Sequence, residues 1–494
     1  MDDLEQLSAA ALARPAEQPA IEFQKRWISW GEMRRVGERV GDLIVASGAG
    51  PGARVAFVAR NRPSALAALL GMIARRCTIR MIYPFQSATA IARDLDEIEP
   101  SVLVAAAEDY PETILAVLRS NGIAAIALQE MEACSLPGLE RARRAGDATL
   151  PPQVEILTSG TTGPPKPFRL SYETIARHIV GPRAMNSAGS GEPALPPPAL
   201  LYFPVGNISG LYSTLPALLN GQRAVLLDRF SLAGWHDHLL RFRPEIGGLP
   251  PAGIQMVLDA GIPPADLSCL RCIGAGAAPL APEVQRAFEE RYGVPILLSY
   301  GATEFAGPVA AMTPELYATW GRSKLGSVGR ALPGAQLRVV DPGSGAVLPP
   351  GQEGILEVIT PRIGPGWIHT SDVAAIDEDG FLFLRGRADG AIIRGGFKLL
   401  PETIERALLL HPGVSAAAVI GLADPRLGQV PAALVQLAPE SPQTSIAELE
   451  AHLREHVPAT HIPVAWRFVD ALPRTAMSFK VDRPAVRKLF EGAD

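Results

Sequence analysis

The chain of 494 residues is poor in cysteine, and this scarcity limits metal and redox chemistry. Of its four cysteines, Cys269 and Cys272 form one C-x-x-C pair, whereas Cys77 and Cys134 are isolated. A zinc site of this kind needs a second pair or a cluster of histidines, and the neighbouring sequence offers neither. We therefore expect structural thiols in a reducing compartment rather than a metal or redox centre.

The chain also lacks an excess of one charge and a long apolar run. Its 46 Lys and Arg residues face 51 Asp and Glu residues, which gives no reason to expect a nucleic acid or an anionic membrane as partner. The acidic start, Met1–Glu5, is not typical of a signal peptide, and runs such as Ala65–Ala74 are too short to span a bilayer. We expect a cytoplasmic protein without a membrane span, either a monomer or a homodimer.

Alternating helix and strand patterns are present instead, and they predict an α/β fold. Residues 32–46 carry apolar side chains at helical spacing, residues 54–58 are typical of a buried strand, and the alternation continues. From residue 326 the pattern becomes rich in β-strand. Such alternation predicts a sheet covered by helices, and the length favours about three domains.

A polar segment bracketed by glycines, Gly386–Gly390, lies between two apolar runs and is either a hinge or a simple turn. We predict a large N-terminal domain at residues 1–386, made of α/β subdomains and a β-rich subdomain. A hinge at residues 387–390 would then lead into a small, mobile α+β domain at residues 391–494.

The segment Thr158–Lys166 combines hydroxyl side chains, two glycines and one lysine directly after an apolar strand. Glycine lets backbone N–H groups approach an anion, while hydroxyls and lysine add donors and charge. The segment therefore suggests a cradle for a polyphosphate, although such clusters are also common in surface turns. It is not a Walker A loop, because Pro165 and Pro167 flank the lysine.

Four further signals are modest when each is taken alone. Gly274–Leu280 follows a strand with small residues that leave space for a flat ligand. Tyr300–Glu304 offers a ring, a hydroxyl and a carboxylate suited to Mg²⁺, although an isolated acid is more often a surface residue. Asp372 is suited to ribose hydroxyls or to an Asx-turn, and Lys480 is either functional or merely solvated.

Taken in order, these segments resemble the acyl-adenylate-forming superfamily, which includes acyl- and aryl-CoA ligases, adenylation domains and luciferases. The resemblance covers nearly the whole chain and is most specific in Thr158–Lys166 and Gly380–Glu405. It implies ATP, Mg²⁺ and coenzyme A as cofactors. The ATP- or AMP-binding residues that it implies are Thr158, Ser159, Gly160, Thr161, Thr162, Gly163, Lys166, Gly276, Ala277, Ala278, Tyr300, Gly301, Ala302, Asp372 and Arg387.

The resemblance also implies individual roles. Thr158–Lys166 would hold the β- and γ-phosphates, Gly276 and Ala277 would line the adenine, and Tyr300 would stack on it. Asp372 would bind the ribose with help from Arg387.

Three residues are implied to be catalytic. Thr303 would contact the α-phosphate, Glu304 would be the metal ligand, and Lys480 would contact the carboxylate and the α-phosphate. Asp389 would be the pivot of the small domain.

For the acyl group and for coenzyme A the resemblance implies two further sets of residues. The acyl pocket would be formed by Asn207, Ile208, Gly210, Gly274, Ala275, Ser299, Phe305 and Gly307, and coenzyme A would contact Gly395, Gly396 and Phe397.

The chain departs from the family pattern at several of these places. Pro167 stands where a glycine is usual, Asn207 replaces a histidine, and Gly206 replaces the aromatic residue beside it. Gly390 replaces an acid, and Phe479 precedes Lys480 where a glycine is usual. Because of these changes, we do not transfer to this chain the way in which the family gates the tunnel that admits the thiol.

The expected substrate is a hydrophobic carboxylic acid, because no acid is placed to hold an α-amino group. Glycines 206, 210 and 307 suggest room for a ring or a bulky acyl group. The main hypothesis is an AMP-forming acid–thiol ligase that makes an aryl- or acyl-adenylate and transfers the acyl group to coenzyme A. One alternative is loading of a separate carrier protein, and another is a non-catalytic nucleotide-binding relative.

Overall fold

The computed structural model describes residues 3–84, 86, 88–158, 166–181, 196–394, 397–424, 427–439, 443–457, 459–475 and 480–491. The chain divides into two compact units. The first unit comprises Met1–Gly248, Gly261–Arg271 and Gly301–Gly307, and the second comprises Leu249–Ala260, Cys272–Tyr300 and Pro308–Asp494.

The first unit begins with helices and strands in alternation, as the sequence pattern predicts. In chain order they are α1 (Leu4–Leu12), β1 (Pro19–Phe23), β2 (Arg26–Ser29), α2 (Trp30–Ala46), β3 (Arg54–Val58), α3 (Pro63–Ala74), β4 (Thr78–Ile82), α4 (Ala88–Ile98), β5 (Val102–Ala106), η1 (Ala107–Asp109), α5 (Glu112–Asn121), β6 (Ala124–Gln129), β7 (Glu132–Ser135), β8 (Gln153–Thr158), β9 (Lys166–Ser171), α6 (Tyr172–Thr174), η2 (Ile175–Val180), β10 (Ala199–Leu201), α7 (Ile208–Leu219), β11 (Ala224–Leu226), α8 (Leu232–Phe242), β12 (Ile246–Gly248), η3 (Pro264–Leu267) and η4 (Thr303–Phe305).

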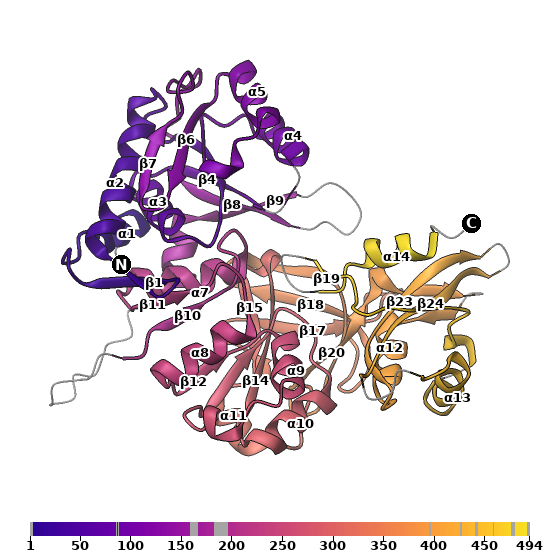
Figure 1. The fold of residues 1–494 in the computed structure, drawn as a ribbon. Helices are drawn as coiled ribbons and strands as arrows, with labels where there is room; N and C mark the ends of the chain where they lie inside the picture. The colour runs from indigo at the N-terminus through magenta and orange to yellow at the C-terminus, as the bar shows by residue number, and fades with distance from the viewer. Residues whose placement is uncertain are drawn as a thin grey trace. The chain divides into compact units, whose positions relative to one another are not determined.

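The largest sheet of the first unit has the strand order β7-β6-β5-β3-β4-β8-β9, and Figure 1 shows helices on both of its faces. Strand β3 explains this arrangement, because successive side chains of a strand point to opposite faces. Val55 and Phe57 belong to a core shared with α1, α2 and α3, whereas Ala56 and Val58 pack with α4 and α5. The continuous apolar run of β3 is thus buried on both sides.

The second unit is richer in strands. Its elements are α9 (Pro251–Asp259), β13 (Cys272–Ala275), α10 (Pro282–Tyr292), β14 (Ile296–Ala302), β15 (Gly307–Ala311), α11 (Pro314–Trp320), β16 (Arg330–Ala331), β17 (Gln336–Val340), β18 (Gly354–Thr360), β19 (Gly364–Ile376), β20 (Leu382–Arg387), η5 (Ala388–Gly390), β21 (Ile392–Arg394), β22 (Phe397–Leu399), α12 (Pro401–Leu409), β23 (Val414–Asp424), β24 (Gly428–Leu437), α13 (Ile446–His456), η6 (Ala459–His461), β25 (Ala465–Phe468) and α14 (Arg483–Glu491).

The C-terminal part of the second unit builds its core by the same rule. Strand β23 places Ala417 and Val419 in a core with α12 and α13, and Ala418 and Ile420 in a core with Val486 of α14. Its sheet has the order β22-β21-β24-β23, with β25 beside β24. Before it lies the antiparallel sheet β17-β18-β19-β20, so the β-rich texture after residue 326 and the small α+β region are both present.

Two features considered from composition, a membrane span and a metal site, can be examined in the described residues. No described helix is both long enough and apolar enough to traverse a bilayer. The described histidine, cysteine and acidic side chains form no group of three or more that could hold a metal ion.

Candidate active site

The predicted phosphate loop connects two antiparallel strands. Strands β8 and β9 pair so that Thr158 lies opposite Lys166. These two residues are described by their backbone, whereas Ser159, Gly160, Thr161, Thr162 and Gly163 lie outside the described residues. The structure therefore locates the base of the loop at the end of a two-stranded ladder.

A buried ion cluster lies in the strand that leads into this loop. The side chain of Glu155 is only 2% exposed, and its carboxylate accepts a bond of 2.6 Å from Nε of Arg80 in β4. Arg54 and Arg169 add charges at 3.5 Å and 3.4 Å. Burial alone would raise the pKa of Glu155, but the three arginines outweigh it and the pKa is lowered.

This cluster escaped the sequence analysis, although it has a visible signal. Glu155 is a single carboxylate inside the apolar strand β8, and a buried charge requires a partner. The partner Arg80 lies 75 residues earlier, so the sequence alone could not identify it. The cluster fastens β8 to β4, and it thereby fixes the base of the predicted phosphate loop.

Thr303 and Glu304 lie in the short helix η4, which packs against β8 within the first unit. The helix ends at Ala306, whose φ of 53° is left-handed, and Gly307 follows with a φ of 119°. Phe305 is 2% exposed and anchors the turn, whereas Glu304 is exposed. An exposed carboxylate suits Mg²⁺, which usually takes one or two protein carboxylates and completes its coordination with water and phosphate.

Asn207 caps a helix. Its side-chain oxygen accepts a hydrogen bond of 2.7 Å from the backbone N–H of Gly210, which makes it the N-cap of α7. Ile208, the first residue of that helix, is buried. The structure thus gives Asn207 a conformational role at the place where the family usually has a histidine.

Two of the glycines expected to leave room for the acyl group are required by packing. A Cβ atom on Gly210 would lie 1.9 Å from the carbonyl oxygen of Pro204, and one on Gly307 would lie 2.2 Å from the ring of Tyr212. The hydroxyl of Tyr212 also donates a bond of 2.8 Å to the carbonyl of Ala306. At Gly210 and Gly307 the place of a Cβ atom is thus taken by backbone and by an aromatic ring.

In the second unit, small residues at the end of β13 and directly after it lie against β14. Gly274 and Ala275 pair with Leu297 and Leu298, and the next residue, Gly276, leaves no room for a side chain. A Cβ there would lie 2.6 Å from Oγ of Ser299. Ala277 then adopts a left-handed φ of 66°, and Ala278 continues the loop. Only a glycine allows this close approach at position 276.

Tyr300 and Asp372, predicted to contact adenine and ribose, are brought together. The hydroxyl of Tyr300 donates a hydrogen bond of 2.5 Å to Oδ2 of Asp372, across 72 residues of sequence. The backbone N–H of Asp372 donates to Oγ1 of Thr370 at 3.0 Å, which fixes the strand around it. Asp372 also faces Arg387 across the β19–β20 ladder.

The remaining predicted residues occupy the ends of elements. Gly301 and Ala302 close β14, and Asp389 lies in η5. Phe397 begins β22 and is described by its backbone, while Gly395 and Gly396 lie outside the described residues.

Lys480 is exposed, and its carbonyl accepts a bond of 2.8 Å from the N–H of Thr475. The lysine therefore lies at the surface, three residues before the start of α14.

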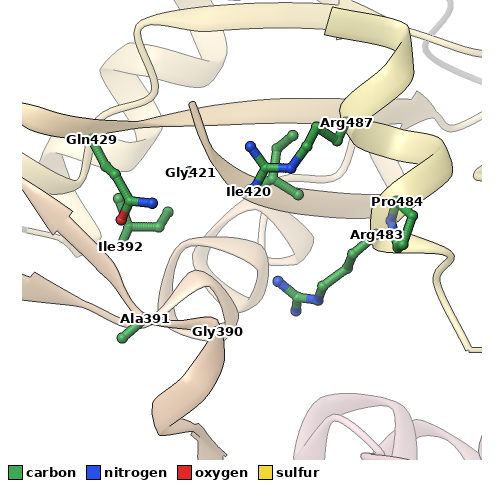
Figure 2. Close-up of a pocket in the computed structure, with 9 residues that line it drawn as sticks. All are labelled: Gly390, Ala391, Ile392, Ile420, Gly421, Gln429, Arg483, Pro484 and Arg487. Carbon is green, nitrogen blue, oxygen red and sulfur yellow. The ribbon is translucent and has the colours of Figure 1, made fainter. Parts of the chain in front are cut away.

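A cavity of about 390 Å³ lies beside the predicted hinge and was not foreseen (Figure 2). Gly390, Ala391 and Ile392 line one side, and the arginines of α14, Arg483 and Arg487, line another. Figure 2 shows both guanidinium groups directed toward the space between these segments.

Comparison with known proteins places the chain in a family. The model of the AMP-binding enzyme family matches residues 7–367, and that of the AMP-binding enzyme C-terminal domain matches residues 403–478. The chain belongs to the AMP-binding enzyme family. The suspected resemblance is therefore confirmed.

Relatives of this AMP-binding enzyme include two ligases. It is 31% identical over 501 residues to indoleacetate–CoA ligase of Aromatoleum aromaticum, with 95% of this chain and 94% of the relative covered. It is 28% identical over 506 residues to the fatty acid–[acyl-carrier-protein] ligase ScoC of Streptomyces coeruleorubidus, with 96% and 94% covered.

The fold agrees with that of ATP-bound MatB from Rhodopseudomonas palustris. The TM-score is 0.80 at 23% identity, with 99% of each chain covered. The predicted α/β class is confirmed.

Proposed function

We propose that this AMP-binding enzyme activates a hydrophobic carboxylic acid, aryl or acyl, with ATP and transfers the acyl group to coenzyme A. The products are acyl-CoA, AMP and pyrophosphate. The observation that supports this most is the hydrogen bond between Tyr300 and Asp372, which joins the two side chains expected on adenine and ribose. The named CoA ligase among the relatives supports the choice of thiol.

The first step forms the acyl-adenylate. An oxygen of the substrate carboxylate attacks the α-phosphorus of ATP, and the bond to pyrophosphate breaks. Lys480 stabilises the negative charge that develops there, and Thr303 contacts the α-phosphate. Glu304 would hold Mg²⁺, which when bound supplies further positive charge to the phosphates. Thr158–Lys166 would hold the departing β- and γ-phosphates.

The second step transfers the acyl group. The thiol sulfur attacks the acyl carbonyl, AMP leaves, and the thiol proton passes to solvent. One site must first exclude water and then admit the thiol, which rotation of residues 391–494 about Asp389 would achieve. The N-terminal domain (1–386) and the hinge (387–390) remain predictions, as does the contact of coenzyme A with Gly395, Gly396 and Phe397.

A carrier protein is the second candidate acceptor. It is favoured by one observation, the match to a fatty acid–[acyl-carrier-protein] ligase along nearly the whole chain. Both acceptors present the same thiol chemistry, so the adenylation residues do not distinguish them.

A pyrophosphate-release screen tests the proposal. Purified protein receives ATP, Mg²⁺ and, in turn, aryl, medium-chain and long-chain acids, with either coenzyme A or a phosphopantetheinylated carrier. We expect acid-dependent pyrophosphate release and formation of acyl-CoA. Thioester formed on the carrier but not on coenzyme A would favour the second candidate. If no acid caused pyrophosphate release, the remaining function would be nucleotide binding without catalysis.

A further inference from the structure

Arg483 makes several hydrogen bonds close in sequence to the predicted catalytic lysine, and it has no role in the proposal so far. It begins α14, three residues after Lys480. Its Nη2 donates to Oε1 of Glu402 at 2.9 Å and to Oε1 of Glu405 at 3.2 Å. Its Nη1 donates to the carbonyl of Val419 at 2.9 Å, and Figure 2 shows the guanidinium beside Gly390 and Ala391.

The carboxylates that Arg483 bridges belong to α12, the first helix after the predicted hinge. Glu405 is only 17% exposed and also accepts a hydrogen bond of 2.8 Å from the N–H of Val419. Arg483 therefore ties together α12, β23 and the start of α14. A planar guanidinium makes such a divergent set of bonds from one rigid group, which a lysine cannot reproduce.

Glu402 extends the network toward the hinge. Its Oε2 is buried and has no hydrogen-bond partner among the described residues. A Cβ on Gly386 would lie 2.7 Å from this oxygen, so the carboxylate rests against the backbone of β20. Gly386 has a φ of 140° and lies three residues before Asp389. One oxygen of Glu402 thus contacts Arg483 and the other contacts the strand that enters the hinge.

The residues that directly follow Lys480 are also held in place, by backbone contacts. The N–H of Asp482 donates to the carbonyl of Pro473 at 2.9 Å, and Arg474 forms a β-bridge with Val481. Pro473 and Arg474 thus hold Val481 and Asp482, the two residues that separate Lys480 from Arg483. Displacing Arg483 would shift this short stretch of backbone and, with it, Lys480.

We propose that Arg483 is a positioning residue that couples the hinge to Lys480 through Glu402 and Glu405. This inference rests on the proposed function. Arg483 touches no substrate in this role. It sets the place of Lys480 relative to the strand that enters the hinge, so its loss acts on the step that needs the lysine. An ion pair that only holds the fold together would instead weaken both half-reactions alike.

The test uses Arg483→Lys in the full-length protein, with Arg487→Lys as the matched control. Arg487 lies one turn further along α14, lines the same cavity, and reaches a carboxylate only at 4.0 Å, on Glu491. The acid that gives most pyrophosphate in the screen serves as substrate, and its synthetic acyl-AMP serves for the second half-reaction. We expect Arg483→Lys to slow pyrophosphate exchange by about tenfold and Arg487→Lys to leave it unchanged.

A double-mutant cycle with Lys480→Ala decides whether Arg483 acts through the lysine. We expect Arg483→Lys to have little further effect on exchange in the Lys480→Ala protein, measured with excess enzyme. Independent, multiplying losses, or equal losses in both half-reactions, would overturn the proposal. If Arg483→Lys lowers the melting temperature sharply, Glu402→Gln carries the same cycle, because it keeps the volume and removes the charge.

A wild-type protein without pyrophosphate exchange on any acid would refute the proposed function. An active wild type whose Arg483 and Lys480 variants show independent effects would refute this inference alone.

Discussion

Two clusters of arginine and glutamate flank the segments assigned to catalysis, and they are built in opposite ways. Under the phosphate loop, Glu155 is surrounded by Arg80, Arg54 and Arg169, and its pKa is lowered. Near Lys480, Glu405 shares the guanidinium of Arg483 with Glu402. There, burial raises the pKa of Glu405 to about 7, although Arg483 opposes the rise.

The difference indicates what each cluster does. An excess of positive charge keeps Glu155 ionised, so the strand beneath the loop is fixed at neutral pH. Two carboxylates on one guanidinium leave the second cluster close to a change of protonation, beside a segment that would move. The first cluster therefore acts as an anchor of β8, whereas the second holds a carboxyl group whose pKa lies near neutral pH.

The region around Lys480 is the one to which we assign catalysis. Lys480→Ala should therefore have the largest effect on activity. We expect adenylation to fall by at least about 100-fold, because a charge aimed at the transition state is lost. Thioester formation from pre-made acyl-AMP should fall far less. Pyrophosphate exchange and single-turnover thioester assays measure the two steps, with the exposed Lys488→Ala as control. Equal losses in both steps would remove Lys480 from the proposed role.

The Glu155 cluster fastens β8 to β4, so its loss should lower the free energy of unfolding. Glu155→Ala leaves Arg80 buried without its closest partner, and we expect unfolding free energy to fall by about 3–5 kcal/mol. Urea denaturation measures it. Glu99→Ala, which removes an exposed partner of Arg144, should lower the unfolding free energy far less. Similar losses for the two variants would show that the Glu155 cluster is not an anchor.

The pH dependence of stability should have opposite sign in the two regions. Glu405 binds its proton more tightly when folded, so its contribution makes stability fall as pH rises from 4.5 to about 7. Glu155 binds its proton less tightly when folded, so its contribution is present above pH 4.5 and is lost as pH falls below it. Urea titrations at several pH values measure both.

Variants isolate each contribution to that profile. Glu405→Gln should flatten the fall between pH 4.5 and 7, and Glu155→Gln should flatten the loss at acid pH. An unchanged profile in Glu405→Gln would contradict the contrast drawn between the clusters.

The smallest effect concerns the scaffold of the first region. Asn207→Ala removes the N-cap of α7 and should cost about 1 kcal/mol of unfolding free energy, whereas Asn207→Ser should preserve most of it. Acyl-CoA formation at saturating substrate should change little in either variant. A large loss of thioester formation with unchanged stability would instead assign Asn207 to the gating that the family's histidine suggests.

Local patterns were enough to predict much of the fold. The apolar spacing of residues 32–46 corresponds to α2, and the buried strand at 54–58 is β3. Such elements follow from the periods of helix and strand, which the sequence shows directly. The change from the short helix α6 to a π-helix at residues 175–180 has no such local signal.

The contacts of the candidate site differ in how far apart their residues lie in the sequence. The cap formed by Asn207 is local and could have been recognised from its place before a helix. The pairings of Tyr300 with Asp372 and of Arg483 with Glu402 span 72 and 81 residues, and no local pattern specifies them. The ring of Tyr212 against Gly307 is a long-range contact of the same kind.

Exchange of labelled pyrophosphate into ATP decides whether this enzyme forms an acyl-adenylate. With Mg²⁺ and the best acid of the screen, we expect acid-dependent exchange in the absence of any thiol, because the acyl-adenylate forms first. We also expect acyl-CoA and AMP in equal amounts once coenzyme A is added. Exchange that occurs only with coenzyme A present, or thioester formed with release of ADP and phosphate, would contradict adenylation of the acid.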